Sequence, residues 1–180
     1  MRWLNEPGRW EGREDRLDVR TDPDTDFWQR THYGFRRDSG HFFYREMTRD
    51  FTASVQVEGR YRDQYDQAGL MLRASDQVWL KAGIEYVDGA QQASVVVTRS
   101  YSDWSVSPLA PAAERFWVRV TRQGGNISVE GSTDGETYAL LRIAWLIDDA
   151  PLQVGAMCAS PEGSGFDVTF HELRVLPRIG

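Results

Sequence analysis

The chain contains almost no lysine. Of its 21 lysine and arginine residues, Lys81 is the one lysine and all the others are arginine. There is also a single cysteine, Cys158, which excludes an internal disulfide. The apolar runs are too short for a membrane-spanning helix, and the polar N-terminal residues lack the apolar core of a signal peptide. We therefore expect a cytoplasmic protein without a membrane partner.

Basic charge is not in excess either. The formal net charge is −6, and the arginines are dispersed among acids, which argues against a nucleic-acid partner. The 180 residues are 41% hydrophobic and 12% aromatic, a composition typical of a globular protein, and we expect one domain spanning 1–180. Seven tryptophans are many for this length, and tryptophan is common on binding faces.

Helical periodicity is also missing, because no stretch keeps a 3.6-residue apolar repeat for three turns. Short runs of alternating apolar and polar residues are instead separated by turn signals, among them Asp88-Gly89, Gly124-Gly125 and Asp134-Gly135. Without βα alternation, this pattern predicts an all-β, two-sheet antiparallel sandwich. The expected strands are Arg16–Thr21, Gly40–Tyr44, Phe51–Val57, Gln67–Arg73, Val78–Tyr86, Ala93–Ser100, Phe116–Arg122, Asn126–Gly131, Tyr138–Ala144, Leu152–Cys158 and Gly165–Val175.

The lone lysine lies in the middle of one expected strand, residues 78–86. A chain that uses arginine almost everywhere else indicates that the compact, movable ammonium of Lys81 serves a purpose that a flat guanidinium does not. Alternation places Trp79, Lys81, Gly83 and Glu85 together on one face of the sheet. An aromatic ring, an amine, a gap and a carboxylate side by side are typical of a floor for a polar ligand.

Several long strings resemble the family called domain of unknown function 1349, the regulation-of-enolase protein family. They are TDFWQRTHYGFRRDSGHFFYR, YDQAGLMLR, WLKAGIEY, SVVVTRSYSDWS and GAMCASPEGSGF, and the resemblance covers nearly the whole chain. It implies a sandwich of the concanavalin A-like lectin/glucanase superfamily, a jelly roll with one concave sheet. The family supplies no settled activity, and this fold carries many functions.

On that fold, the strand next to residues 78–86 would add Gln67 and Arg73 to the concave face. We expect a sugar or similar polar ligand there, with Lys81 projecting into an open, solvent-reached basin. Trp104, expected on a rim loop, would offer a stacking surface. The long polar connection over residues 22–41 would contribute at the rim, as such connections often do. The predicted ligand-binding residues are Lys81, Glu85, Arg73, Trp79, Gln67, Tyr65, His32, Tyr33 and Trp104.

Other interpretations remain open. The same face can be a solvated surface on which Glu85 pairs with Lys81 or Arg73. A carbohydrate-active enzyme, glycosidase-like or lyase-like, would use Glu85 and Lys81, but a glycosidase needs a second carboxylate. Asp66 and Asp103 are the candidates for it. A third possibility is a domain that binds and regulates a metabolic enzyme.

A metal site is the last candidate. Asp22, Asp24 and Asp26 alternate and allow a structural calcium, but Pro23 interrupts the run and the glycine and glutamate of an EF-hand loop are missing. Turn formation explains such aspartates more simply, so we expect no cofactor.

Overall fold

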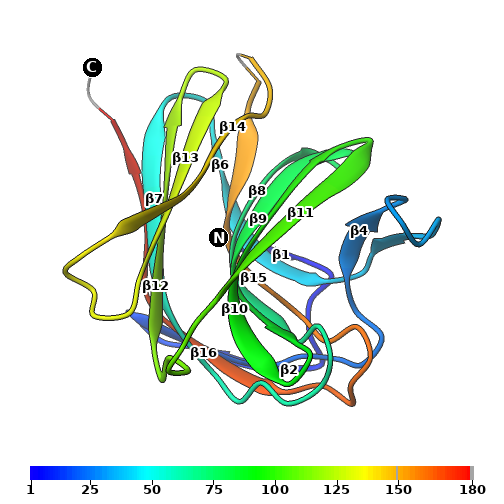
Figure 1. Cartoon of the computed structure of the whole chain (residues 1–180). Helices are drawn as coiled ribbons and strands as arrows, with labels where there is room; N and C mark the ends of the chain where they lie inside the picture. The colour runs from blue at the N-terminus through cyan, green and yellow to red at the C-terminus, as the bar shows by residue number, and fades with distance from the viewer. Residues whose placement is uncertain (149, 179–180) are drawn as a thin grey trace.

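The computed structural model describes residues 1–148 and 150–178. Within these residues, every regular element is a strand, and no helix is long and apolar enough to cross a membrane. Two seven-stranded antiparallel sheets pack face to face as a sandwich (Figure 1). The predicted fold class is thus confirmed.

The strands fall into three sheets. Sheet I has the order β1 (Arg2–Leu4), β6 (His41–Met47), β15 (Leu152–Ala159), β8 (Gln67–Ser75), β9 (Val78–Val87), β10 (Ala90–Arg99) and β11 (Tyr101–Pro108). Sheet II has the order β14 (Ala139–Trp145), β13 (Asn126–Ser132), β12 (Phe116–Gln123), β7 (Phe51–Gly59), β16 (Asp167–Pro177), β3 (Arg16–Arg20) and β2 (Arg9–Gly12). A small hairpin pairs β4 (Phe27–Gln29) with β5 (Arg36–Asp38).

Every strand predicted from the sequence overlaps an observed strand. The structure adds β1, β2, β4, β5 and β11, which the alternation pattern did not reveal. The prediction that Trp104 lies on a loop is wrong, because Trp104 is in the middle of the edge strand β11. Only one residue of β11 is fully buried, so the strand has no continuous apolar face from which to recognise it.

The main core lies between the two large sheets and follows strict alternation. On β8 and β9, the side chains that point inward are all buried among residues of sheet II: Ala68, Leu70, Leu72, Leu80, Ala82 and Ile84. The opposite side chains of the same strands therefore form the outer face of sheet I. This is the face that the sequence marked as a candidate ligand floor.

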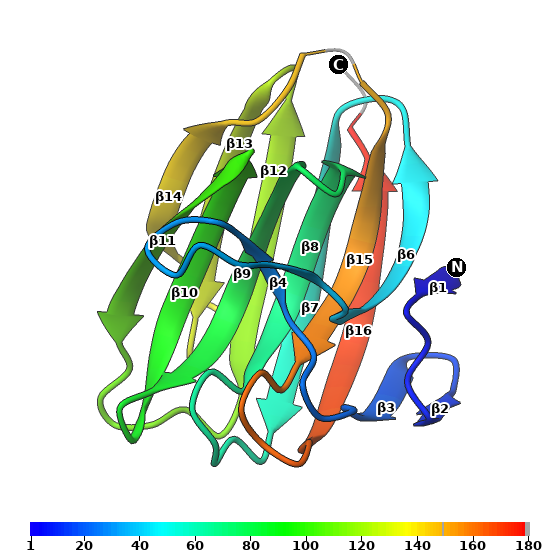
Figure 2. The ribbon, with the colours of Figure 1, turned by 90° about the vertical axis from the view of Figure 1, so that its right-hand side faces the viewer.

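The outer face of sheet I is partly covered. The strands of this sheet curve around the β4–β5 hairpin, which crosses in front of β8, β9 and β10 (Figures 1 and 2). Beneath it lies a second apolar cluster: Phe27, Trp28, Phe42, Tyr44, Met71, Trp79, Val96 and Met157. The connection over residues 22–41 is therefore built into the fold, and it limits what remains accessible on the face.

Candidate functional site

The strand register brings the residues of the predicted floor side by side. Glu85 lies opposite Gln67 and Lys81 opposite Met71, while β10 brings Ser94 beside Gly83 on the other flank. Gly83 stands between Lys81 and Glu85 on this face, where an added Cβ would clash with the carbonyl oxygen of Ala68. The missing side chain thus lets the two strands approach closely and leaves a gap between the amine and the carboxylate.

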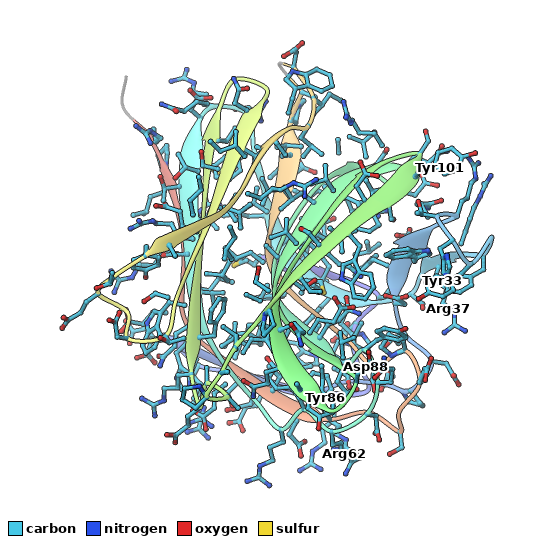
Figure 3. All side chains as sticks on the ribbon, viewed as in Figure 1. Tyr33, Arg37, Arg62, Tyr86, Asp88 and Tyr101 are labelled. Carbon is cyan, nitrogen blue, oxygen red and sulfur yellow. The ribbon has the colours of Figure 1, made fainter. Side chains whose placement is uncertain are left out.

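A cavity of about 170 Å³ lies at the Glu85 end of this floor. Sheet I forms its base, and the β4–β5 hairpin and two loops form its walls. Tyr33 and Arg37 come from the hairpin segment, on the side of the molecule that faces the outer surface of sheet I (Figure 3). Its lining residues are Asp26, Trp28, Tyr33, Phe35, Arg37, Tyr65, Gln67, Lys81, Glu85, Trp104, Pro161 and Glu162.

Lys81 lines the cavity, but the expectation of an open basin around its amine is wrong. The side chain is only 4% exposed. Its Nζ donates to the carbonyl oxygen of Phe27 at 2.7 Å and lies 3.2 Å from Oδ1 of Asp26. The hairpin supplies both partners, so the buried ammonium is held by a carboxylate and a carbonyl rather than by water. The predicted pairing of Lys81 with Glu85 is replaced by Lys81 with Asp26.

Glu85 is the second buried charged group on the floor, at 6% exposure. Its Oε2 accepts hydrogen bonds from Ser94 Oγ at 2.6 Å and from the Trp104 indole at 2.8 Å. Burial raises the pKa of this carboxyl above its ordinary value, Asp26 adds to the rise, and Lys81 opposes it. Two strands of sheet I therefore fix one oxygen of Glu85.

Aromatic rings surround this polar floor. The Trp104 ring meets Trp28 edge-on at 6.5 Å between centroids and Tyr65 at 6.2 Å. The rings of Tyr33 and Phe35 stack at 5.6 Å. These five side chains come from β4, β11 and two loops, so their flat faces are presented from several directions. Such a combination of aromatic walls and few polar groups is typical of a small-ligand site.

Tyr65 and Gln67, two of the predicted site residues, line the cavity. The hydroxyls of Tyr33 and Tyr65 are 3.2 Å apart, and this contact raises the pKa of Tyr33 to about 12. The Gln67 amide donates to the carbonyl of Tyr65 and to Asp26. Its carbonyl oxygen is buried and has no hydrogen-bond partner among the described residues. Leaving a buried acceptor unpaired costs about 1–3 kcal/mol.

Three predicted site residues lie away from the cavity. Trp79 is fully buried beneath the hairpin, against the Phe27 ring, so it offers no stacking face. Arg73 forms a bidentate ion pair with Asp38 of β5, at 2.7 and 2.8 Å, and fastens the hairpin to the sheet. His32 is exposed at the hairpin tip with a φ of 63° and packs edge-on against Tyr33.

Other lining residues were not predicted from the sequence. Asp26, Trp28, Phe35 and Arg37 come from the hairpin, and Pro161 and Glu162 come from the loop after β15. The polar, aromatic-rich composition of residues 22–41 marked the segment as a whole. This composition does not predict which residues of the hairpin face the sheet, because the hairpin packs on the sheet through tertiary contacts and shows no regular alternation in its sequence.

The alternating aspartates serve different purposes. Asp22 accepts from the Gly8 amide, Asp24 adopts a φ of 57°, and Asp26 binds Lys81. Within residues 1–148 and 150–178, no group of three or more His, Cys, Asp or Glu side chains is arranged to hold a metal ion.

Comparison with known proteins gives the chain a family. The family described as protein of unknown function (DUF1349) matches residues 3–178. The chain belongs to this family. A curated relative from Saccharomyces cerevisiae, "Regulation of enolase protein 1", is 43% identical over 178 residues, which are 99% of this chain and 90% of the relative. "Uncharacterized protein AN7484" from Emericella nidulans is 23% identical and covers 85% of this chain and 81% of its own length.

Solved structures support the architecture. A crystal structure of a functionally unknown protein from Saccharomyces cerevisiae superposes with a TM-score of 0.95 at 42% identity, over 99% of this chain and 97% of that one. The carbohydrate-binding module CBM66 from Bacillus subtilis has a TM-score of 0.60 at 13% identity, over 97% of this chain and 94% of that one. The GH43 protein BlXynB from Bacillus licheniformis has a TM-score of 0.69 at 15% identity, over 91% of this chain and 33% of that one. At such low identities, the last two share only the fold.

Proposed function

We propose that this protein binds a small carbohydrate, or a metabolite of similar polarity, in the cavity on the outer face of sheet I without converting it. The observation that carries the proposal is the cavity itself, in which five aromatic rings surround a floor containing Gln67, Lys81 and Glu85. Aromatic faces suit the C–H surfaces of a sugar ring. Fixed charged and amide groups suit its hydroxyls.

The size of the cavity limits the ligand. At about 170 Å³ it is smaller than the roughly 300–1,000 Å³ of sites for drug-sized molecules. A monosaccharide or the terminal unit of a longer chain therefore fits better than an internal segment of a polysaccharide. The likeness of the fold to a carbohydrate-binding module is compatible with this size and function, but does not select the ligand.

Hydrolysis is the weaker alternative, because the acids considered as partners for Glu85 do not line the cavity. Asp66 is fully buried and accepts from Ser160 and two backbone amides. Asp103 pairs in register with Val97, a residue of the main core, and so lies on the inner side of β11. Of the other acids that line the cavity, Asp26 is already bound to Lys81, and Glu162 is exposed at the rim. A hydrolase would need a free pair of carboxyl groups.

The experiment is calorimetric titration of the wild type with neutral, amino and acidic monosaccharides. Trp104→Ala should weaken any binding at least about tenfold, or about 1.4 kcal/mol, because it removes one wall and one hydrogen bond to Glu85. Trp145→Ala is the matched control, since Trp145 is comparably exposed but lies on β14 of sheet II. Absence of binding across the whole panel, or equal loss in both variants, would contradict the proposal.

A second candidate is a protein interaction. The edge strand β14 exposes Leu140, Ile143 and Trp145, which is an unusual cluster of large apolar side chains on one short strand. The name of the yeast relative suggests enolase as the partner to try. Purified enolase should then bind the wild type and lose affinity for Ile143→Asp. No binding of purified enolase to the wild type would reject this candidate.

A further inference from the structure

The cavity floor contains an unbalanced set of buried charges. Asp26, Lys81 and Glu85 are 7%, 4% and 6% exposed, which gives two carboxylates and one amine removed from water. Lys81 is already bound to Asp26 at 3.2 Å. Among residues 1–148 and 150–178, no second cation pairs with Glu85, and a buried carboxylate without a cation is costly.

Hydrogen bonding does not fully compensate Glu85. Asp66 is a useful comparison in the same protein, since it is fully buried and, within the part of the chain that the structure describes, accepts from no basic side chain. However, both of its oxygens accept hydrogen bonds, one from Ser160 Oγ and the other from the amides of Arg62 and Asp63. At Glu85, Ser94 and Trp104 both donate to Oε2. Among the described residues, Oε1 accepts from none, although the side chain lines the cavity.

The other charges around the cavity do not supply the missing cation. The Arg37 guanidinium lies 5.4 Å over the Phe35 ring and faces the carbonyls of Asp24 and Pro161. Glu162, exposed at the rim, adds a further negative charge. Tyr33 and Tyr65 share a hydrogen bond between their hydroxyls. Every remaining group near Glu85 is thus neutral, acidic or already engaged.

The aromatic walls of the cavity are also suited to a positively charged ligand. A cation is attracted to the faces of tryptophan and tyrosine within about 6 Å of the ring centre, most strongly where water is excluded. Trp28, Tyr33, Tyr65 and Trp104 all line this cavity. Gln67, whose amide donates to Tyr65 and Asp26, adds a neutral polar group to the lining.

From these observations we infer that the ligand carries a protonated amine, which occupies the position between Glu85 Oε1 and the aromatic walls. A hexosamine fits both this charge and the proposed binding of a small carbohydrate. A sugar acid is excluded from the same place, because its carboxylate would face Glu85. This inference rests on the proposed function and defines its ligand class.

The experiment compares sugars that differ in one group. Glucosamine, glucose, N-acetylglucosamine and glucuronate are titrated into the wild type at pH 7, and galactosamine is compared with galactose in the same way. We expect each amine to bind at least tenfold more tightly than its neutral counterparts, and glucuronate not to bind. Glu85→Gln keeps an acceptor for Ser94 and Trp104 but removes the charge, so glucosamine should then bind no better than glucose. Glu58→Gln removes the same charge from sheet II and should retain the preference.

The outcomes separate this inference from the proposed function. Neutral sugars that bind as tightly as the amines would overturn the inference and leave carbohydrate binding intact. If methylammonium or tetramethylammonium binds through Glu85 but no sugar binds, the result would support the cation site and overturn the proposal that the ligand is a carbohydrate. A preference for amines that persists in Glu85→Gln would also overturn the inference. Absence of binding by every probe would overturn both proposals.

Discussion

The two ends of the outer face of sheet I have opposite characters, although they belong to the same strands. At one end, Trp79 is fully buried against Phe27 of the hairpin. At the other, Lys81 and Glu85 line a cavity with aromatic walls. Both ends follow the same alternation along β9, so local sequence does not explain the difference. What differs is the covering segment, which lays an apolar ring on one end and a carboxylate beside the other.

The covered end should contribute most to stability. Phe27→Ala removes a fully buried ring that packs on Trp79 and lies close over Gly40. We expect it to lower the free energy of unfolding by about 3–5 kcal/mol, measured by urea denaturation. Phe35 belongs to the same segment but is 42% exposed, and Phe35→Ala should cost less than about 1 kcal/mol. Equal losses would show that the hairpin is not a second core.

The boundary between the two ends is the buried ion pair. Lys81→Met leaves Asp26 and Glu85 buried without a cation, and should cost about 3 kcal/mol in the same denaturation experiment. Adding Asp26→Asn removes one of the two buried carboxylate charges that Lys81→Met leaves unpaired, so the double variant should regain much of the lost stability. If the two substitutions instead cost the sum of their separate effects, the pair would not be coupled.

A substitution at the cavity end should change the free energy of unfolding least, and should raise it rather than lower it. Burial raises the pKa of Glu85 in the folded state, so its contribution to stability is complete below the ordinary value of 4.5 and is lost as pH rises through the folded value. Glu85→Gln, which cannot ionise, should be more stable than the wild type at neutral pH. That advantage should shrink below pH 4.5. Denaturation midpoints from pH 4 to pH 8 measure it, and a difference independent of pH would contradict the assignment.

The floor of the site was predictable because a strand has a period of two. Once Val78–Tyr86 is recognised as a strand, Lys81 and Glu85 must share a face, and the observed register pairs Glu85 with Gln67 of the neighbouring strand, as expected. The roles of Trp79 and Arg73 were not predictable in this way. Alternation says which face a side chain occupies, but not whether another part of the chain covers it.

The arrangement of the walls could not be predicted for the same reason. Asp26 and Lys81 are separated by 55 residues, and Trp28 and Trp104 come from elements that meet only in the folded chain. The polar composition of residues 22–41 identified a segment of interest, yet gave neither its hairpin nor the sheet on which it packs. The sequence predicts a loop at Trp104 because β11 is an edge strand with polar residues on both sides.

By itself, the sequence determined the all-β sandwich, most of its strands and the face shared by Lys81 and Glu85, because these depend on turn residues and alternation within short segments. Only the tertiary structure decided that Lys81 binds Asp26, that Trp79 belongs to a second core, and that Glu85 lines a cavity with aromatic walls. Those outcomes depend on where a distant hairpin docks, and docking is governed by the burial of apolar rings and the pairing of charges across the chain.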